Sequence, residues 1–183
     1  MAWKSVNNKY LIVKPGVVLT PRTDEVIFQL DPFFKDSPSY VTSALRDAYN
    51  QLAVIRQYLV RKGLDKKYPV AMTCKPQDMV FDSTLGRNIY AWQWAWSNLL
   101  NVGVVINPAL QATCLMHTTF DKRDRFGKVI NQTPHARGGA FNIGGGTNGA
   151  QDEFDNVTRG AKAGVKVKPL LERENNACHC DCL

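Results

Sequence analysis

The sequence predicts an α+β fold, a single domain in which helices pack on a small, mainly antiparallel sheet. Apolar residues recur at helical spacing in the first two thirds of the chain, whereas the last third reads as strands and loops. Helices first and strands late are typical of this class. With 183 residues and neither an internal repeat nor a long linker, the chain has the size of one domain over residues 1–183, and residues 1–38 are expected to pack on it as an N-terminal extension.

The N-terminal part is predicted to contain two extended segments and one helix. Residues 26–30, Val-Ile-Phe-Gln-Leu, include two β-branched residues and one aromatic residue and are expected to form a strand, and residues 40–43 begin a second extended piece. From Asp47 to Lys62 the apolar residues recur at helical spacing, and Gly63 supplies the stop. The apolar residues that recur in this way are Tyr49, Leu52, Ala53, Leu59 and Val60.

Further elements are predicted after this helix. A second helix is expected over residues 89–102, followed by an extended run at 104–106 and a short helix at 109–116. In the final third, one helix is expected over residues 152–163. The aromatic stripe of the 89–102 helix is assigned to the core, and its members are Trp92, Trp96, Leu99 and Leu100.

Charge and composition exclude several classes of protein. The net charge is +7, but the basic residues are scattered and no nucleic-acid-binding motif is present, so nucleic acid is not an expected partner. No stretch reaches the ~20 apolar residues that span a bilayer, and the N-terminus lacks the apolar core of a signal peptide. We therefore expect a protein that is made and kept in a cytoplasm or is exported without a cleaved signal. A host cytoplasm before holin-assisted release, or a phage virion, would satisfy the second option.

Five cysteines occur, three of them in the last six residues. An odd number without a signal peptide argues against a disulfide framework. Cys178, Cys180 and Cys182 would share one face of a strand. They are expected to be small buried hydrophobes of the core, with a soft-metal site as the alternative.

One segment, residues 133–143, has the features of a metal site. His135 leads into a turn, glycines permit close approach of the backbone, and Asn142 follows seven residues later in an alternating strand. A loop that runs into a strand can bring these two positions together. His179, on a late strand, is the candidate for the remaining ligand.

This segment resembles the S-x-H-x-x-G-x-A-x-D motif of the zinc D,D-carboxypeptidases and L-alanyl-D-glutamate endopeptidases (VanX- and VanY-like enzymes and many phage endolysins). Thr133 stands for the serine, Asn142 stands for the aspartate, and the other motif positions match. Residues 43–46, Ser-Ala-Leu-Arg, resemble the family's S-G-Y-R motif, and residues 172–179 correspond to its E-x-x-H motif. The three motifs follow the family order.

The resemblance implies a peptidase that cleaves the stem peptides of peptidoglycan with a zinc ion. His135, His179 and the residue at 142 would hold the metal. Arg46, with Ser43, would bind the substrate carboxylate, and Arg46 would also stabilise the oxyanion of the tetrahedral intermediate. A glutamate near His179 would accept the proton of the zinc-bound water.

Two positions depart from the family pattern. Asn142 is neutral, so zinc is expected to bind weakly or not at all, because an amide is a weaker ligand than a carboxylate. Asn176 occupies the glutamate position of E-x-x-H and cannot act as a base. Glu174 shares strand parity with Asn176 and is the better substitute, ahead of Glu172. His117 is read as a polar residue at a helix end rather than as a ligand.

Three hypotheses follow. The first is a phage- or bacterium-derived zinc peptidase of peptidoglycan whose hydrolysis is weakened or lost. The second is a non-catalytic component of a phage particle, in the tail or baseplate, that keeps the peptidase fold and contacts other virion proteins. The third is an interaction module in which the motifs serve core packing alone.

Overall fold

The computed structural model describes residues 2–67, 72, 75, 77–82, 86–90, 121–123, 129–132 and 134–183. The chain divides into two compact units. Unit 1 consists of Met1–Arg46 and Pro134–Leu183, and unit 2 consists of Asp47–Thr133. Each unit is described by itself below, and the prediction of one domain over residues 1–183 stays a prediction.

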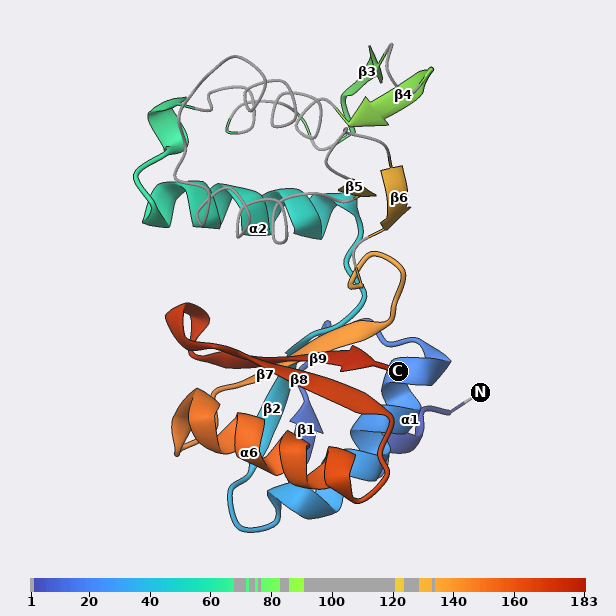
Figure 1. Cartoon of the computed structure of the whole chain (residues 1–183), viewed down its shortest axis with the longest axis vertical. Helices are drawn as coiled ribbons and strands as arrows, with labels where there is room; N and C mark the ends of the chain where they lie inside the picture. The colour runs from blue at the N-terminus through green and yellow to red at the C-terminus, as the bar shows by residue number, and fades with distance from the viewer. Residues whose placement is uncertain are drawn as a thin grey trace. The chain divides into compact units, whose positions relative to one another are not determined.

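Unit 1 is built on a five-stranded sheet with the order β1-β2-β7-β9-β8. The β1–β2 pair is parallel and the other pairs are antiparallel, so the predicted α+β class with a mainly antiparallel sheet is confirmed. The strands are β1 (Leu11–Val13), β2 (Ser39–Ser43), β7 (Ala140–Gly144), β8 (Val167–Glu172) and β9 (Ala177–Cys182). Helices α1 (Pro21–Leu30) and α6 (Gly149–Lys162) lie on one side of this sheet (Figure 1).

The core of unit 1 lies between the sheet and these two helices. Phe141 and Ile143 of β7 point into it, and so do the three C-terminal cysteines, which are buried in the core as predicted. Because side chains alternate along a strand, the intervening residues Asn142, His179 and Asp181 belong to the opposite face of the sheet. That face carries the polar residues of interest.

The prediction of a strand at residues 26–30 is wrong, because these residues end helix α1. Thr20 and Thr23 form a reciprocal capping box, and Pro21 occupies the first turn, where its missing N–H costs nothing. Val26, Ile27 and Leu30 are buried at the spacing of a helix. The β-branched composition of a five-residue window misled the prediction, and the stronger signal was the cap that precedes it.

Other predicted elements are confirmed with adjusted bounds. The extended piece at residues 40–43 is β2, and the helix predicted at 152–163 is α6, which begins at Gly149. Leu11 of β1 and Phe34 of the 3-10 helix η2 (Asp31–Phe34) are fully buried in the core of unit 1, and the prediction of an N-terminal extension over residues 1–38 stays a prediction. The remaining 3-10 helices of unit 1 are η1 (Lys4–Asn7) and η4 (Arg173–Asn175).

In unit 2 the predicted 47–62 helix is α2 (Ala48–Arg61), and its N-cap Asp47 accepts a hydrogen bond from Asn50 N at 2.8 Å. Among its apolar residues, Leu52 and Leu59 are buried, whereas Ala53 and Val60 are exposed. Among the described residues of unit 2, the other elements are the 3-10 helix η3 (Asp65–Lys67) and the antiparallel pairs β3 (Met79–Asp82) with β4 (Arg87–Tyr90) and β5 (Asp121–Arg123) with β6 (Val129–Gln132).

The helix predicted at 89–102 is wrong at its start, because Ile89 and Tyr90 belong to β4. Its remaining residues, including the stripe Trp92, Trp96, Leu99 and Leu100, lie outside the described residues, as do the elements predicted at 104–106 and 109–116, His117, Cys74 and Cys114.

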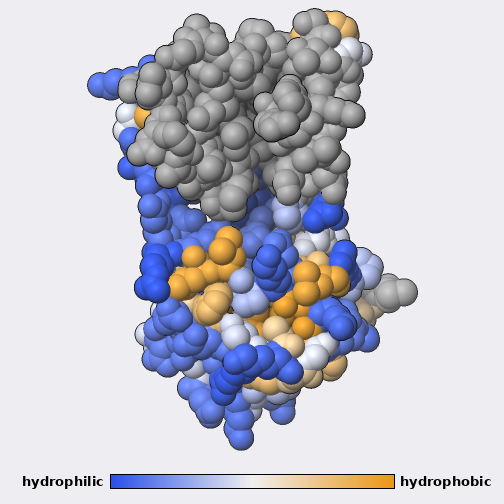
Figure 2. Space-filling model, in the orientation of Figure 1, coloured by the Kyte–Doolittle hydropathy of each residue, from blue (hydrophilic) through white to orange (hydrophobic). Residues whose placement is uncertain are grey.

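The described surface of unit 1 mixes hydrophilic areas with apolar ones (Figure 2). Among the described helices, none has the length and apolarity to cross a membrane.

Candidate functional site

The structure brings the two predicted histidines together around Asn142. His135 lies in the turn that precedes β7, and the register of β7 with β9 places Asn142 directly opposite His179. The Asn142 amide lies 3.2 Å from His135 Nε2 and 2.9 Å from His179 Nδ1. The ring centroids are 5.0 Å apart in an edge-to-face arrangement. One nitrogen of each imidazole therefore points at position 142.

The second nitrogen of each ring already has an acceptor. His135 Nδ1 lies 2.6 Å from the carbonyl oxygen of Ala44, and His179 Nε2 lies 3.0 Å from Asp181 Oδ1. A carbonyl and a carboxylate can only accept, so these ring nitrogens carry the protons of the neutral imidazoles. The nitrogens that face Asn142 are then both acceptors.

This assignment fixes the orientation of the Asn142 amide. With its nitrogen toward the rings, it donates to both imidazoles, and its oxygen accepts from an Arg46 guanidinium N–H at 3.2 Å. The opposite orientation would set an amide oxygen against two ring acceptors. Arg46, Asn142, His135 and His179 thus form one network in which these donors and acceptors are matched.

Burial makes His135 a neutral residue. Its side chain is buried, and its pKa falls from 6.5 to about 3 because of burial, then the Arg46 charge and the neighbouring His179. The hydrogen bond to the Ala44 carbonyl opposes this shift. At neutral pH the ring is therefore uncharged, as an imidazole must be to accept a hydrogen bond or to bind a metal.

Arg46 and Ser43 lie at the site, as the motif comparison predicted. The chain leaves β2 at Ser43, and the backbone N–H of Arg46 donates to the carbonyl of His135 at 3.2 Å. The Arg46 guanidinium also donates to Ser43 Oγ at 3.2 Å. Burial lowers the Arg46 pKa, and the Glu172 carboxylate opposes that effect. The backbone hydrogen bond to His135 and the side-chain hydrogen bond to Ser43 thus hold the Arg46 guanidinium beside the Asn142 amide.

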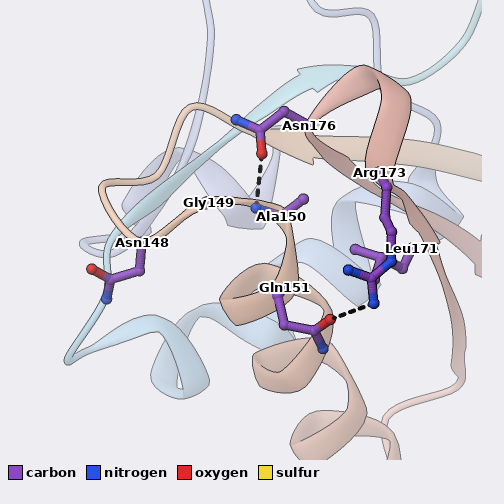
Figure 3. A pocket seen from close by; sticks show the side chains of 7 residues that line it. All are labelled: Asn148, Gly149, Ala150, Gln151, Leu171, Arg173 and Asn176. Atoms are coloured by element: carbon purple, nitrogen blue, oxygen red, sulfur yellow. Dashed lines mark hydrogen bonds between the residues drawn. The ribbon is translucent and has the colours of Figure 1, made fainter.

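The E-x-x-H region is arranged differently from the prediction. Glu174 lies exposed in the η4 turn, before β9 begins, and the hydrogen-bond partners of the two imidazoles are Ala44, Asn142 and Asp181. Asn176 adopts a left-handed conformation (φ 46°), and its Oδ1 accepts from Ala150 N at 3.2 Å (Figure 3). Position 176 therefore caps α6, on the core side of the sheet.

Figure 3 shows that this cap is part of a pocket at the start of α6, where Arg173 also donates to Gln151 Oε1. This pocket is lined by residues of the β7–α6 loop, of α6, of the end of β8 and of the β8–β9 turn. It does not include either histidine. The Asn of the E-x-x-H position thus has a structural role that does not involve the histidine pair.

The carboxylate that contacts the pair is Asp181, which the sequence reasoning missed. It lies two residues after His179 on β9, so both side chains project from the same face. Its pKa is lowered, first by the hydrogen bond from His179. Its signal in the sequence is the H-x-D spacing on a predicted strand, which places both side chains on one face.

The motif glycine and alanine have packing roles. Gly138 has φ +70°, and its carbonyl accepts from Thr20 Oγ1 at 2.8 Å, so a side chain here would collide with Thr20. Ala140 is fully buried. The small residues of the H-x-x-G-x-A pattern therefore let the His135 turn pack closely against the start of α1.

The donor set fits zinc in part. His135 Nε2 and His179 Nδ1 converge, and each ring is fixed from behind by an acceptor, as metal-binding histidines usually are. The third position offers only an amide, and within the described part of the chain no three His, Cys, Asp or Glu side chains gather as a metal site. Zinc normally takes three protein ligands of these types, so the arrangement predicts a weak site.

Comparison with known proteins adds no further identification: no family model, no curated protein and no solved structure matches this chain.

Proposed function

We propose that this chain is a phage- or bacterium-derived protein of the zinc peptidase type, which acts on peptidoglycan stem peptides with weakened hydrolysis. The observation that supports the proposal is the convergence of His135 Nε2 and His179 Nδ1 on position 142, with the Arg46 guanidinium on the same amide. Three motif positions that are far apart in the sequence thus meet at one point. The third hypothesis, core packing alone, does not account for a half-buried cation beside two imidazoles on the face of the sheet that points away from the core.

His135, His179 and Asn142, with its amide turned so that Oδ1 faces the rings, would hold the zinc. A bound zinc would supply an activated water as the nucleophile. Arg46 would orient the peptide through its carboxylate, because a guanidinium matches a carboxylate with two parallel hydrogen bonds. Turning the amide would also release the Arg46 N–H from Asn142 Oδ1, which would leave that donor for the substrate.

Hydrolysis is expected to be weak for two reasons. Asn142 contributes no negative charge to offset a divalent cation, and the Arg46 charge beside it opposes cation binding further. Glu174 remains the proposed proton acceptor, but its place in the η4 turn requires movement or a bridging water to reach the histidine pair.

A second candidate function is a non-catalytic component of a phage tail or baseplate that keeps the peptidase fold. The observation that favours it is that hydrogen bonds alone pair the donors and acceptors of Arg46, Asn142 and the two histidines, so the network needs no metal ion to hold it together. In this case the site would bind stem peptides through Arg46 without cleaving them.

Purified muropeptides distinguish these two candidates. Incubation of the protein with muropeptides and zinc, analysed by mass spectrometry, should give slow cleavage that chelator abolishes. Binding without cleavage, equal with and without zinc, would support the non-catalytic component. Neither cleavage nor binding would contradict both functions.

A further inference from the structure

The Asp181 carboxylate is the feature of the site that the family motifs do not assign. We propose that Asp181 is a positioning residue that holds His179 in the tautomer with the proton on Nε2, so that Nδ1 faces position 142 with its lone pair. The effect on metal binding rests on the proposed function, whereas the effect on the tautomer rests on the hydrogen bonds alone.

The two imidazoles need opposite tautomers to present lone pairs to one point. His135 faces Asn142 with Nε2 and must carry its proton on Nδ1, whereas His179 faces Asn142 with Nδ1 and must carry its proton on Nε2. A neutral imidazole in water exchanges between both forms. Each ring therefore needs an acceptor behind it that selects one form.

The two acceptors differ in kind. His135 Nδ1 donates to the backbone carbonyl of Ala44, which is held by the main chain and cannot become a donor. His179 Nε2 donates to Asp181 Oδ1, a partly exposed side chain. The orientation of His179 is thus the one that a single side-chain substitution can release.

The backbone geometry supports this pairing. Asp181 and His179 are alternate residues of β9, and β9 is paired on both edges, with β7 through Asn142 and Ala140 and with β8. The strand that carries both side chains is therefore fixed within the sheet. Asp181 also places a negative charge next to Nε2 of His179, whereas the Arg46 cation contacts the Asn142 amide. Since Asn142 carries no charge, Asp181 supplies a negative charge that position 142 lacks.

The substitution Asp181→Asn tests the proposal, since an asparagine amide can either accept from or donate to Nε2. Long-range ¹H–¹⁵N spectra of ¹⁵N-labelled, chelator-treated protein report the tautomer of each histidine. The wild type should show His179 with its proton on Nε2. Asp181→Asn should shift it to a mixture, Asp181→Ala should shift it further, and His135 should keep its proton on Nδ1.

The matched control is Asp36→Asn, which removes one negative charge at an exposed position of unit 1 and should leave the tautomer unchanged. In zinc titrations, Asp181→Asn should weaken binding by about 10- to 100-fold, as loss of such partners usually does, and Asp36→Asn should not. A proton on His179 Nδ1 in the wild type, or an unchanged tautomer in both Asp181 variants, would overturn the proposal. Absence of zinc binding in every form would overturn the proposed function instead, and the tautomer spectra would still decide the role of Asp181.

Discussion

Protonation of His135 should make a large contribution to the destabilisation of unit 1 by acid. Its side chain is buried beside the Arg46 cation, and its pKa in the folded protein is lowered to about 3. In the unfolded chain the ring would titrate at its ordinary value of about 6.5. Below that pH the unfolded state binds a proton that the folded state excludes. The stability that depends on a neutral His135 is therefore complete above about pH 6.5 and is lost progressively as the pH falls toward 3.

The size of the effect follows from the two pKa values. With 6.5 in the unfolded state and about 3 in the folded state, linkage gives a loss of about 3 kcal/mol between pH 7 and pH 4. That is a large part of the ~5–15 kcal/mol that stabilises an ordinary domain. Most of the loss should occur below pH 6, where the unfolded chain is already protonated.

Urea unfolding at pH 7 and pH 4, in the presence of chelator, measures this loss. The comparison is with His135→Asn, whose amide N–H can still donate to the Ala44 carbonyl but does not titrate. The wild type should lose about 3 kcal/mol more than the variant over this range. The same pH dependence in both proteins would refute the reasoning, because it would mean that His135 is not held neutral by its surroundings.

Three further predictions concern unit 1. Arg46→Ala should weaken the binding of muropeptides, or the stabilisation of their transition state, by roughly 2–4 kcal/mol without lowering the zinc content; unchanged binding and turnover, or unfolding of the variant, would mean that Arg46 has a structural role only. Glu153 is buried with a raised pKa caused by burial, and its Oε2 has no partner among the described residues. Wild-type stability should therefore decline as the pH rises through that pKa, and Glu153→Gln should remove the decline and gain about 1 kcal/mol at pH 7 in urea unfolding; an equal pH profile would contradict this. Gly138→Ala should cost about 2–4 kcal/mol in the same assay, because of its positive φ and the collision with Thr20; a cost below about 1 kcal/mol would contradict it.

The sequence predicted the elements whose signals are long or periodic. Helices α2 and α6 have apolar residues at helical spacing, and the strand that carries the cysteines alternates over six residues. Helix α1 was misread because Val26–Leu30 has a composition that suits strands, while the start of the helix is encoded in the Thr20 cap. Short windows of β-branched residues do not decide between the two structures.

The part of the site that depends on local sequence spacing was predictable, and the part that depends on long-range strand pairing was not. The seven-residue separation of His135 and Asn142 predicted their convergence, because a turn followed by a strand returns the chain to the same point. The pairing of β7 with β9, which brings in His179, depends on long-range register that no local pattern specifies. Asp181 was missed for the same reason, since its role appears only once His179 is known to face Asn142.

Zinc titration calorimetry on the chelator-treated protein tests the account most directly. We predict one weakly bound zinc per chain, loss of that binding in His135→Ala and in His179→Ala, and an affinity at least about tenfold higher in Asn142→Asp, where a carboxylate offsets part of the ion's charge. Asn7→Asp makes the same chemical change at an exposed position of η1 and should have no effect. Zinc binding that survives both histidine substitutions, or equal affinities for the wild type and Asn142→Asp, would contradict a zinc-peptidase-type site at position 142.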